Sequence, residues 1–130
     1  MMDTKAVDFD ATIAEYDVGG PFVETLGAPI EMMVRRVKAW LAQDIEVVIL
    51  TARVHPCHGE ESAERFKEQI REWCRINVGR ELEVTHEKHP RFSEIWDDKA
   101  ISVIPNTGLR VDGVEDVPVE SDSIGVFLDG

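Results

Sequence analysis

Cysteines, basic residues and long apolar runs are scarce in this chain. The two cysteines, Cys57 and Cys74, make no disulfide framework and lack metal-ligand spacing, so we expect free thiols in a reducing cytoplasm. The apolar runs are too short to cross a bilayer, which predicts that the protein has no membrane partner. The first residues, Met-Met-Asp-Thr-Lys, lack the basic and apolar regions of a signal peptide, which again favours a cytoplasmic location.

The shortage of basic residues bears on binding partners. The chain has 14 Lys and Arg residues against 26 Asp and Glu residues, and its formal net charge is −12. Proteins that bind nucleic acid broadly do so with clustered positive charge, so this kind of partner is not expected. A phosphorylated small molecule is compatible with the charge, because a bound cation and a few local donors can outweigh the global field. The excess of carboxylates also suggests that some of them surround a metal ion.

The chain does contain an alternation of strand and helix patterns. β-Branched and apolar runs predict strands, and apolar residues at three- and four-residue spacing predict helices. Gly and Pro punctuate residues 14–29, so we expect a loop or tight hairpin there, either a flap over a pocket or a plain connection. The predicted elements are a strand within Lys5–Ile13, a helix over 30–43, a strand over 46–50, a helix over 60–76, a strand over 82–85, a short apolar segment at 95–96 and a strand over 100–104.

This alternation predicts an α/β fold with a mostly parallel central sheet. With 130 residues, of which 43% are hydrophobic, the chain is large enough for one domain with its own core. We therefore expect a single domain over residues 1–130. Its acidic end, residues 109–130, either adds an edge strand or stays loose.

Two carboxylates stand at the end of the first predicted strand. Asp8 and Asp10 are two residues apart, so both side chains would face one pocket if the extended geometry persists to Asp10. Carboxylates held together repel each other, and a hard divalent cation with oxygen ligands is the usual solution. The alternative is a solvated strand end with turn-forming aspartates.

Other polar residues follow the later strands. Thr51 comes directly after the strand over 46–50, Asp97 and Asp98 follow the apolar segment at 95–96, and Lys88 lies in the loop between them. In open parallel sheets, ligands bind outside the carboxyl ends of the strands, so these side chains are candidates for one site. Thr51 has a local alternative, in which its hydroxyl only satisfies nearby backbone groups.

Four segments of the chain, taken in order, resemble the motifs of the haloacid-dehalogenase-like (HAD) superfamily. They are D-F-D-A-T at 8–12, L-T-A-R at 50–53, the Lys of V-T-H-E-K at 84–88 and W-D-D at 96–98. The resemblance spans roughly Lys5 to Gly108 and implies a Rossmann-like three-layer sandwich with the first strand at the centre of the sheet. Ala11 stands where glycine is commonest, and no segment is long enough for a large cap domain, so the resemblance implies a capless or minimally capped form.

The resemblance also implies an Mg²⁺-dependent phosphatase that works through an aspartyl-phosphate. Asp8 would be the nucleophile, and Asp10 would protonate the leaving oxygen and then activate the attacking water. The metal would be held by the Asp8 carboxylate, the backbone carbonyl of Asp10 and the acidic pair, with Asp98 as the direct ligand and Asp97 supporting it.

The remaining motif residues receive substrate roles from the same resemblance. Thr51 would donate a hydrogen bond to a phosphoryl oxygen, and Lys88 would neutralise phosphate charge and keep Asp8 ionised. Arg53 would contact the substrate beyond the phosphate or stay a surface residue, and Thr12 would order the turn after the strand. The second aspartate of the first motif favours a phosphatase or phosphotransferase over a dehalogenase, because dehalogenation has no alkoxide to protonate.

Two other functions share parts of this pattern. A response-regulator receiver module has a similar fold, Mg²⁺ site and aspartyl-phosphate, but its acidic pair lies at the first strand and its phosphorylated Asp follows a later one. A non-catalytic, metal-binding relative is the third possibility. For the phosphatase, an open pocket would admit a large or extended phosphorylated substrate such as a nucleic-acid end, whereas assembly into a homo-oligomer would cover the site and select a small nucleotide or sugar phosphate.

Overall fold

The computed structural model describes residues 3–114 of the chain. It divides into two units, Met1–Asp98 and Lys99–Gly130. Among the described residues, all helices and strands lie in the first unit. The prediction of one domain over residues 1–130 stays a prediction, and every helix and strand of residues 3–114 ends before Asp98.

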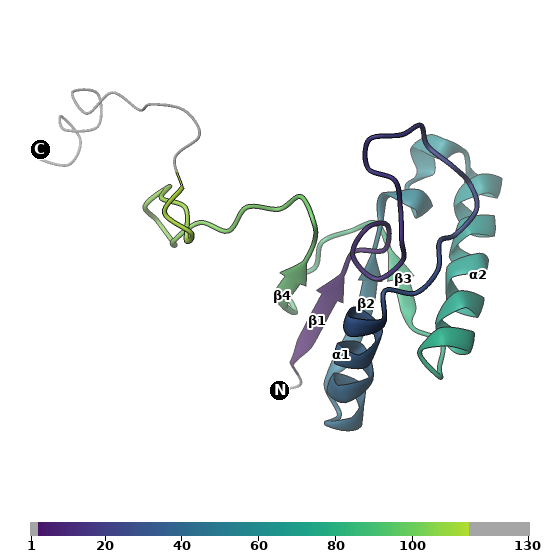
Figure 1. Cartoon of the computed structure of the whole chain (residues 1–130), viewed down its shortest axis with the longest axis horizontal. Coiled ribbons are helices and arrows are strands. Elements are labelled where there is room, and N and C mark those ends of the chain that lie inside the picture. The colour runs from purple at the N-terminus through teal and green to yellow at the C-terminus, as the bar shows by residue number, and fades with distance from the viewer. Residues whose placement is uncertain (1–2, 115–130) are drawn as a thin grey trace, which may run out of the picture. The chain divides into compact units, whose positions relative to one another are not determined.

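The first unit is built on a four-stranded parallel sheet with the strand order β3-β2-β1-β4 (Figure 1). The strands are β1 (Thr4–Val7), β2 (Glu46–Leu50), β3 (Glu83–Thr85) and β4 (Phe92–Trp96). Ala6 of β1 pairs with Val48 of β2 and with Ile95 of β4, so β1 lies inside the sheet. The predicted α/β, Rossmann-like fold with a parallel sheet and a central first strand is confirmed.

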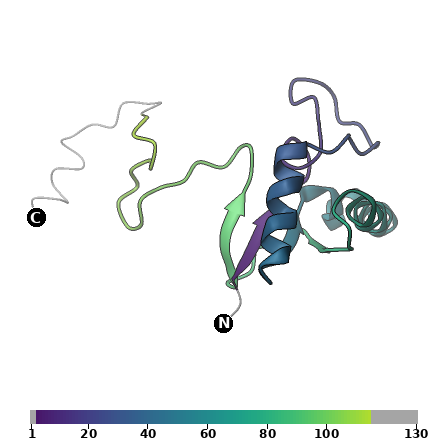
Figure 2. The ribbon, with the colours of Figure 1, turned by 60° about the horizontal axis from the view of Figure 1, so that its bottom comes forward.

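The two predicted helices are present with nearly the predicted bounds. They are α1 (Glu31–Ala42) and α2 (Glu60–Asn77), and two short 3-10 turns, η1 (Ala52–Val54) and η2 (Pro56–His58), link β2 to α2. α1 packs against β2, and α2 packs against β3 and η1 (Figure 2). The apolar stripes that predicted the helices are the faces that they bury, including Val37 of α1 and Ile70 of α2, both fully buried.

One hydrophobic cluster joins both helices to the same face of the sheet. Val7 and Ile49, which pair across β1 and β2, share this cluster with residues of α1 and α2. Residues 86–91, which connect β3 to β4, contain no helix and form a loop and turn instead. In the described residues the two helices therefore form one layer, which apolar burial holds to this face of the sheet, and the carboxyl ends of the strands are left for polar side chains.

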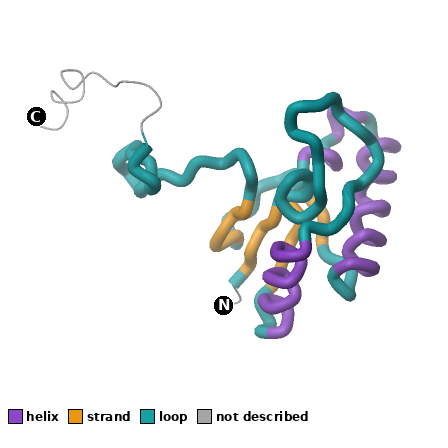
Figure 3. The backbone as a smooth tube through the Cα atoms, viewed as in Figure 1, coloured by secondary structure: helices purple, strands orange, loops and turns teal. Residues whose placement is uncertain are grey.

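The flap, residues 15–29, is a long loop that begins and ends at neighbouring points (Figure 3). Ala14 bridges Pro29, and the N–H of Glu15 donates to the carbonyl of Ala28 over 2.8 Å. Gly27 is required at this closure, because a Cβ there would lie 1.9 Å from the carbonyl oxygen of Glu15. The predicted loop is confirmed.

The prediction for residues 95–104 is partly wrong. The apolar segment at 95–96 is the end of strand β4, which already begins at Phe92. The strand predicted over 100–104 does not form, and Val103 makes only an isolated bridge to Arg110 across a turn. Ile101 and Val103 are about half exposed, at 53% and 52%, so their apolar pattern has no sheet in its unit to bury it. Of the acidic end, residues 115–130 lie outside the described part of the chain.

Candidate metal and phosphoryl-transfer site

The candidate site lies at the carboxyl ends of the two neighbouring strands β1 and β4. Asp8 directly follows β1, and its N–H donates to the carbonyl of Trp96, the last residue of β4, over 2.8 Å. Asp97 and Asp98 directly follow β4. Because β1 and β4 pair side by side, aspartates that are about ninety residues apart in the chain meet at one edge of the sheet.

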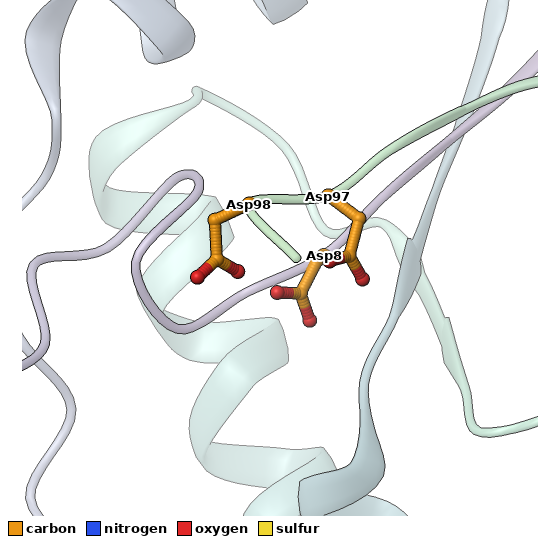
Figure 4. A group of neighbouring side chains, drawn as sticks. All are labelled: Asp8, Asp97 and Asp98. Atoms are coloured by element: carbon orange, nitrogen blue, oxygen red, sulfur yellow. The ribbon is translucent and has the colours of Figure 1, made fainter. Parts of the chain in front are cut away.

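The carboxylates of Asp8, Asp97 and Asp98 form a tight acidic cluster. Each contributes an oxygen that lies within 4.8 Å of the other two, and Figure 4 shows the three side chains gathered at this edge. Asp8 is half-buried, whereas Asp97 and Asp98 are exposed. These are oxygen ligands of the kind that Mg²⁺ prefers, so the residues present fit the metal that the sequence predicts.

Burial and the neighbouring carboxylates raise the pKa of Asp8 from 3.8 to about 7. Desolvation is the largest cause, and repulsion from Asp97 is the next. The backbone N–H of Phe9 acts in the opposite direction by donating to the Asp8 carboxylate, and Asp98 raises the pKa further. A cation among these carboxylates would remove the repulsion and favour the ionised form of Asp8.

Thr12 connects the two halves of the cluster. Its hydroxyl accepts a hydrogen bond from the N–H of Asp98 over 3.1 Å and lies 3.4 Å from Oδ2 of Asp8. The N–H of Thr12 donates to the carbonyl of Phe9, so Thr12 takes part in the turn as predicted. Its contact with Asp98 was not predicted, because sequence spacing alone does not say which residues of β4 arrive beside this turn.

Ala11 occupies a left-handed conformation in the same turn, with φ at 66°. This region suits glycine, and a residue with a Cβ adopts it at a cost of about 1–2 kcal/mol. The sequence has alanine where the resembling motif most often has glycine, and the left-handed φ of Ala11 gives the physical reason why glycine suits this position.

Asp10 does not join the acidic cluster, which corrects the expectation that Asp8 and Asp10 face one pocket through continued extension. Strand β1 ends at Val7, and the chain turns after Asp8, where the Phe9 carbonyl accepts hydrogen bonds from the N–H groups of Thr12 and of the residues after it. The Asp10 carboxylate instead binds Arg53, over 2.7 and 2.9 Å. Metal binding by the Asp10 backbone carbonyl stays a prediction.

Arg53 is buried beside Asp10, so the predicted surface role is wrong, whereas contact with a substrate stays a prediction. Its side chain is 2% exposed, so it is not a surface residue, and its donors are bound to Asp10 and to the flap carbonyls of Val23 and Glu24. Contact with a substrate would require some of these bonds to break. The signal that could have found the pair is topological, because Asp10 and Arg53 follow the adjacent strands β1 and β2.

Thr51 lies at the end of β2, where it was predicted. It is 4% exposed, its N–H donates to the carbonyl of Thr85, and its hydroxyl accepts a hydrogen bond from the N–H of Arg53 over 3.2 Å. The structure therefore shows the local role of Thr51, in which its hydroxyl satisfies a nearby backbone N–H group. The hydroxyl proton is a donor that this bond does not use, so donation to a phosphoryl oxygen stays a prediction.

Lys88 is exposed and makes no hydrogen bond or ion pair with any residue that the structure describes. It lies in the loop over 86–91 rather than on a helix. Burial and the neighbouring carboxylates determine the pKa of Asp8 in this arrangement, so a role for Lys88 in keeping Asp8 ionised stays a prediction. Contact between Lys88 and a phosphate stays a prediction.

A separate groove of about 510 Å³ lies between the start of α2 and the end of β3. None of the aspartates of the cluster lines it. The lining residues are Val54, Pro56, Glu60, Ala63, Glu64, Lys67, Thr85, His86 and Glu87. We assign the candidate chemistry to the acidic cluster and not to this groove, because the groove mixes charges of both signs without converging ligands.

Comparisons with known proteins agree with the fold and leave the function open. No family model matches the chain, and no curated protein matches it. The chain is similar in structure to a conserved protein coded by a locus from Bacteroides thetaiotaomicron, with a TM-score of 0.53 and 23% sequence identity over 89% of this chain and 84% of that one. This likeness supports the α/β fold alone. Within the described residues, no helix has the length and apolar character needed to span a membrane.

Proposed function

We propose that the protein is an Mg²⁺-dependent phosphatase of the HAD type, which hydrolyses a phosphate monoester through an aspartyl-phosphate. The observation that carries the proposal is the convergence of Asp8, Asp97 and Asp98 at the carboxyl ends of β1 and β4. The sequence predicted this convergence from the position of the aspartates after strands of a parallel sheet and from the order of the motifs. A hydrolase is proposed rather than a phosphotransferase, because nothing in the described residues identifies an acceptor alcohol.

Mg²⁺ would be held by the acidic cluster, with Asp98 and Asp8 as carboxylate ligands and Asp97 in support. When bound, the metal supplies charge neutralisation for the phosphoryl oxygens and for the crowded carboxylates. The half-buried position of Asp8 leaves its carboxylate poorly hydrated, which suits a nucleophile better than a fully solvated side chain.

The chain's own residues divide the reaction into two steps. An Asp8 carboxylate oxygen attacks phosphorus, the bond to the leaving oxygen breaks, and Asp10 delivers a proton to that oxygen. Water then attacks the aspartyl-phosphate, its proton passes to Asp10, and inorganic phosphate is released with Asp8 regenerated. Thr51 donates to a phosphoryl oxygen throughout, and Lys88 approaches the phosphate only when substrate is bound.

The net charge of −12 supports a small substrate over a polynucleotide. We propose a nucleotide or another phosphorylated small molecule, in a reducing cytoplasm where the free thiols of Cys57 and Cys74 persist.

A screen of phosphate monoesters with and without Mg²⁺ tests the proposal. Wild type is expected to release phosphate only with the metal, and Asp8→Asn is expected to lose at least about 10³-fold in turnover while staying folded by circular dichroism. Asp17→Asn is the matched control, because Asp17 lies in the flap and donates no group to the cluster. Full activity in Asp8→Asn would remove the proposed nucleophile.

A second candidate is a protein that binds a divalent cation without turnover. The observation that favours it is the exposed, unengaged Lys88 together with the engagement of Asp10 by Arg53. Rapid chemical quench with a radiolabelled phosphate ester separates the two functions. The phosphatase forms a short-lived phosphoenzyme that disappears in Asp8→Asn, whereas the binding protein gives an Mg²⁺-dependent rise in melting temperature and no phosphoenzyme.

A further inference from the structure

The Arg53 side chain is buried among three aromatic rings. Its guanidinium lies 5.0 Å from the ring centre of Phe22, 5.3 Å from that of Phe66 and 5.8 Å from that of Tyr16. With its side chain 2% exposed, the charge is stable only if its N–H groups find acceptors and a counter-charge. The rings contribute attraction of their own through their negative faces.

The guanidinium reaches two separate parts of the chain. On one side it forms a fork with Asp10, from Nε to Oδ2 over 2.7 Å and from Nη2 to Oδ1 over 2.9 Å. On the other side, Nη1 donates to the carbonyl of Glu24 over 3.0 Å and Nη2 to the carbonyl of Val23 over 2.9 Å. One rigid, planar group therefore sets the orientation of a carboxylate and the position of the flap.

We propose that Arg53 is a positioning residue that couples the flap to Asp10, so that the position of the flap and the orientation of the Asp10 carboxylate are fixed together. The catalytic part of this inference rests on the proposed function, in which Asp10 protonates the leaving oxygen. The mechanical part does not, because it concerns only the four hydrogen bonds that the Arg53 side chain makes.

The catalytic consequence is a dependence on the leaving group. An alkyl phosphate needs a proton on its leaving oxygen, so cleavage depends on a correctly aimed Asp10. p-Nitrophenyl phosphate releases a stable anion and needs no such proton. Loss of Arg53 should therefore slow the first ester more than the second, whereas loss of general stability or of phosphate binding would slow both alike.

The first arm of the test measures single-turnover cleavage of both esters by wild type, Arg53→Gln and Arg53→Lys. General acid catalysis contributes about 10²–10⁴-fold, so Arg53→Gln is expected to lose at least about tenfold more on the alkyl ester than on the aryl ester. Arg53→Lys keeps the charge without the fork and should show the same preference, and it serves in place of Arg53→Gln if that variant does not fold. Arg65→Gln is the control, since it removes an exposed 3.6 Å ion pair with Glu24 and a cation–π contact with Phe66 but leaves the Arg53 bonds in place, and it should keep the wild-type ratio.

The second arm measures amide hydrogen exchange of the flap and needs no turnover. Asp10→Ala removes the carboxylate that holds Arg53, and Arg53→Gln removes the side chain that holds the flap carbonyls. Both variants should therefore speed amide exchange in the flap, although Asp10 itself lies outside the flap. If wild type cleaves neither ester, the proposed function fails. The amide exchange of the flap then still tests whether Arg53 couples the flap to Asp10. Equal losses on both esters, or flap exchange unchanged in Asp10→Ala, would overturn the inference.

Discussion

At the scale of single residues, the crowding of carboxylates around Asp8 makes the stability of the metal-free protein depend on pH. The folded protein holds a proton on Asp8 up to about pH 7, whereas the unfolded chain releases it near 3.8. Between these values the folded state binds more protons than the unfolded state, so the free energy of unfolding falls as the pH rises. Above about pH 7, the destabilisation is complete.

We expect Asp8→Asn to show this directly. In the presence of a chelator, the variant should gain melting temperature relative to wild type as the pH rises from about 4 to about 8, because Asn has no charge to lose. Mg²⁺ should raise the melting temperature of wild type above pH 7 and should not do so for the variant. Asp44→Asn, at an exposed position, is the control. If the melting temperatures of wild type and Asp8→Asn change with pH in parallel, the raised pKa of Asp8 is contradicted.

The left-handed turn at Ala11 gives a second prediction at this scale. Ala11→Gly removes the conformational cost of a Cβ at φ 66° and should raise the free energy of unfolding by about 1 kcal/mol in urea titration. The same change at Ala39, exposed in the middle of α1, should lower it by about 0.5–1 kcal/mol. A loss of stability in Ala11→Gly would show that the turn does not favour glycine.

The sequence predicts which aspartates meet in the fold, but it does not predict which arginine is buried. Asp8, Asp97 and Asp98 were predicted to meet because each follows a strand, and parallel strands end at one edge. Arg53 was assigned only a substrate or surface role, because a sequence does not reveal which arginine finds buried acceptors. The same limit applies to Lys88, whose distance from the site depends on the path of a loop.

At the scale of elements, the flap depends on the close approach of its two ends. Gly27→Ala would place a methyl group 1.9 Å from the carbonyl oxygen of Glu15 and would displace the Gly27 carbonyl, which accepts a 2.9 Å hydrogen bond from Nε1 of Trp73. We expect a loss of about 1–3 kcal/mol in stability and a change in tryptophan fluorescence. Gly19→Ala, whose Cβ would meet nothing nearer than 3.8 Å, should change neither.

Element prediction was accurate where periodicity and burial agree. α1, α2 and β2 each bury the residues whose spacing predicted them. The strand predicted over 100–104 was wrong because its apolar residues have no neighbouring strand, and a β pattern needs a partner to become a sheet. β4 was recognised only at its end, since Ser93 and Glu94 interrupt its apolar run.

At the scale of the whole molecule, the division after Asp98 predicts that residues 1–98 are sufficient for the fold and the acidic cluster. A truncated protein ending at Asp98 should keep the circular dichroism of the sheet and helices and an Mg²⁺-dependent rise in melting temperature. A protein ending at residue 90 lacks β4 and the acidic pair and should lose the response to Mg²⁺. Failure of the 1–98 protein to fold would show that Lys99–Gly130 contributes stability.

The pairing of β1 with β4 has a consequence for synthesis. Asp8 precedes Asp97 and Asp98 by about ninety residues, and the acidic pair is made after all helices and strands of the described chain. A growing chain that has not yet reached Asp97 therefore carries Asp8 without its acidic neighbours. The acidic cluster can form only after β4 has been made and has paired with β1.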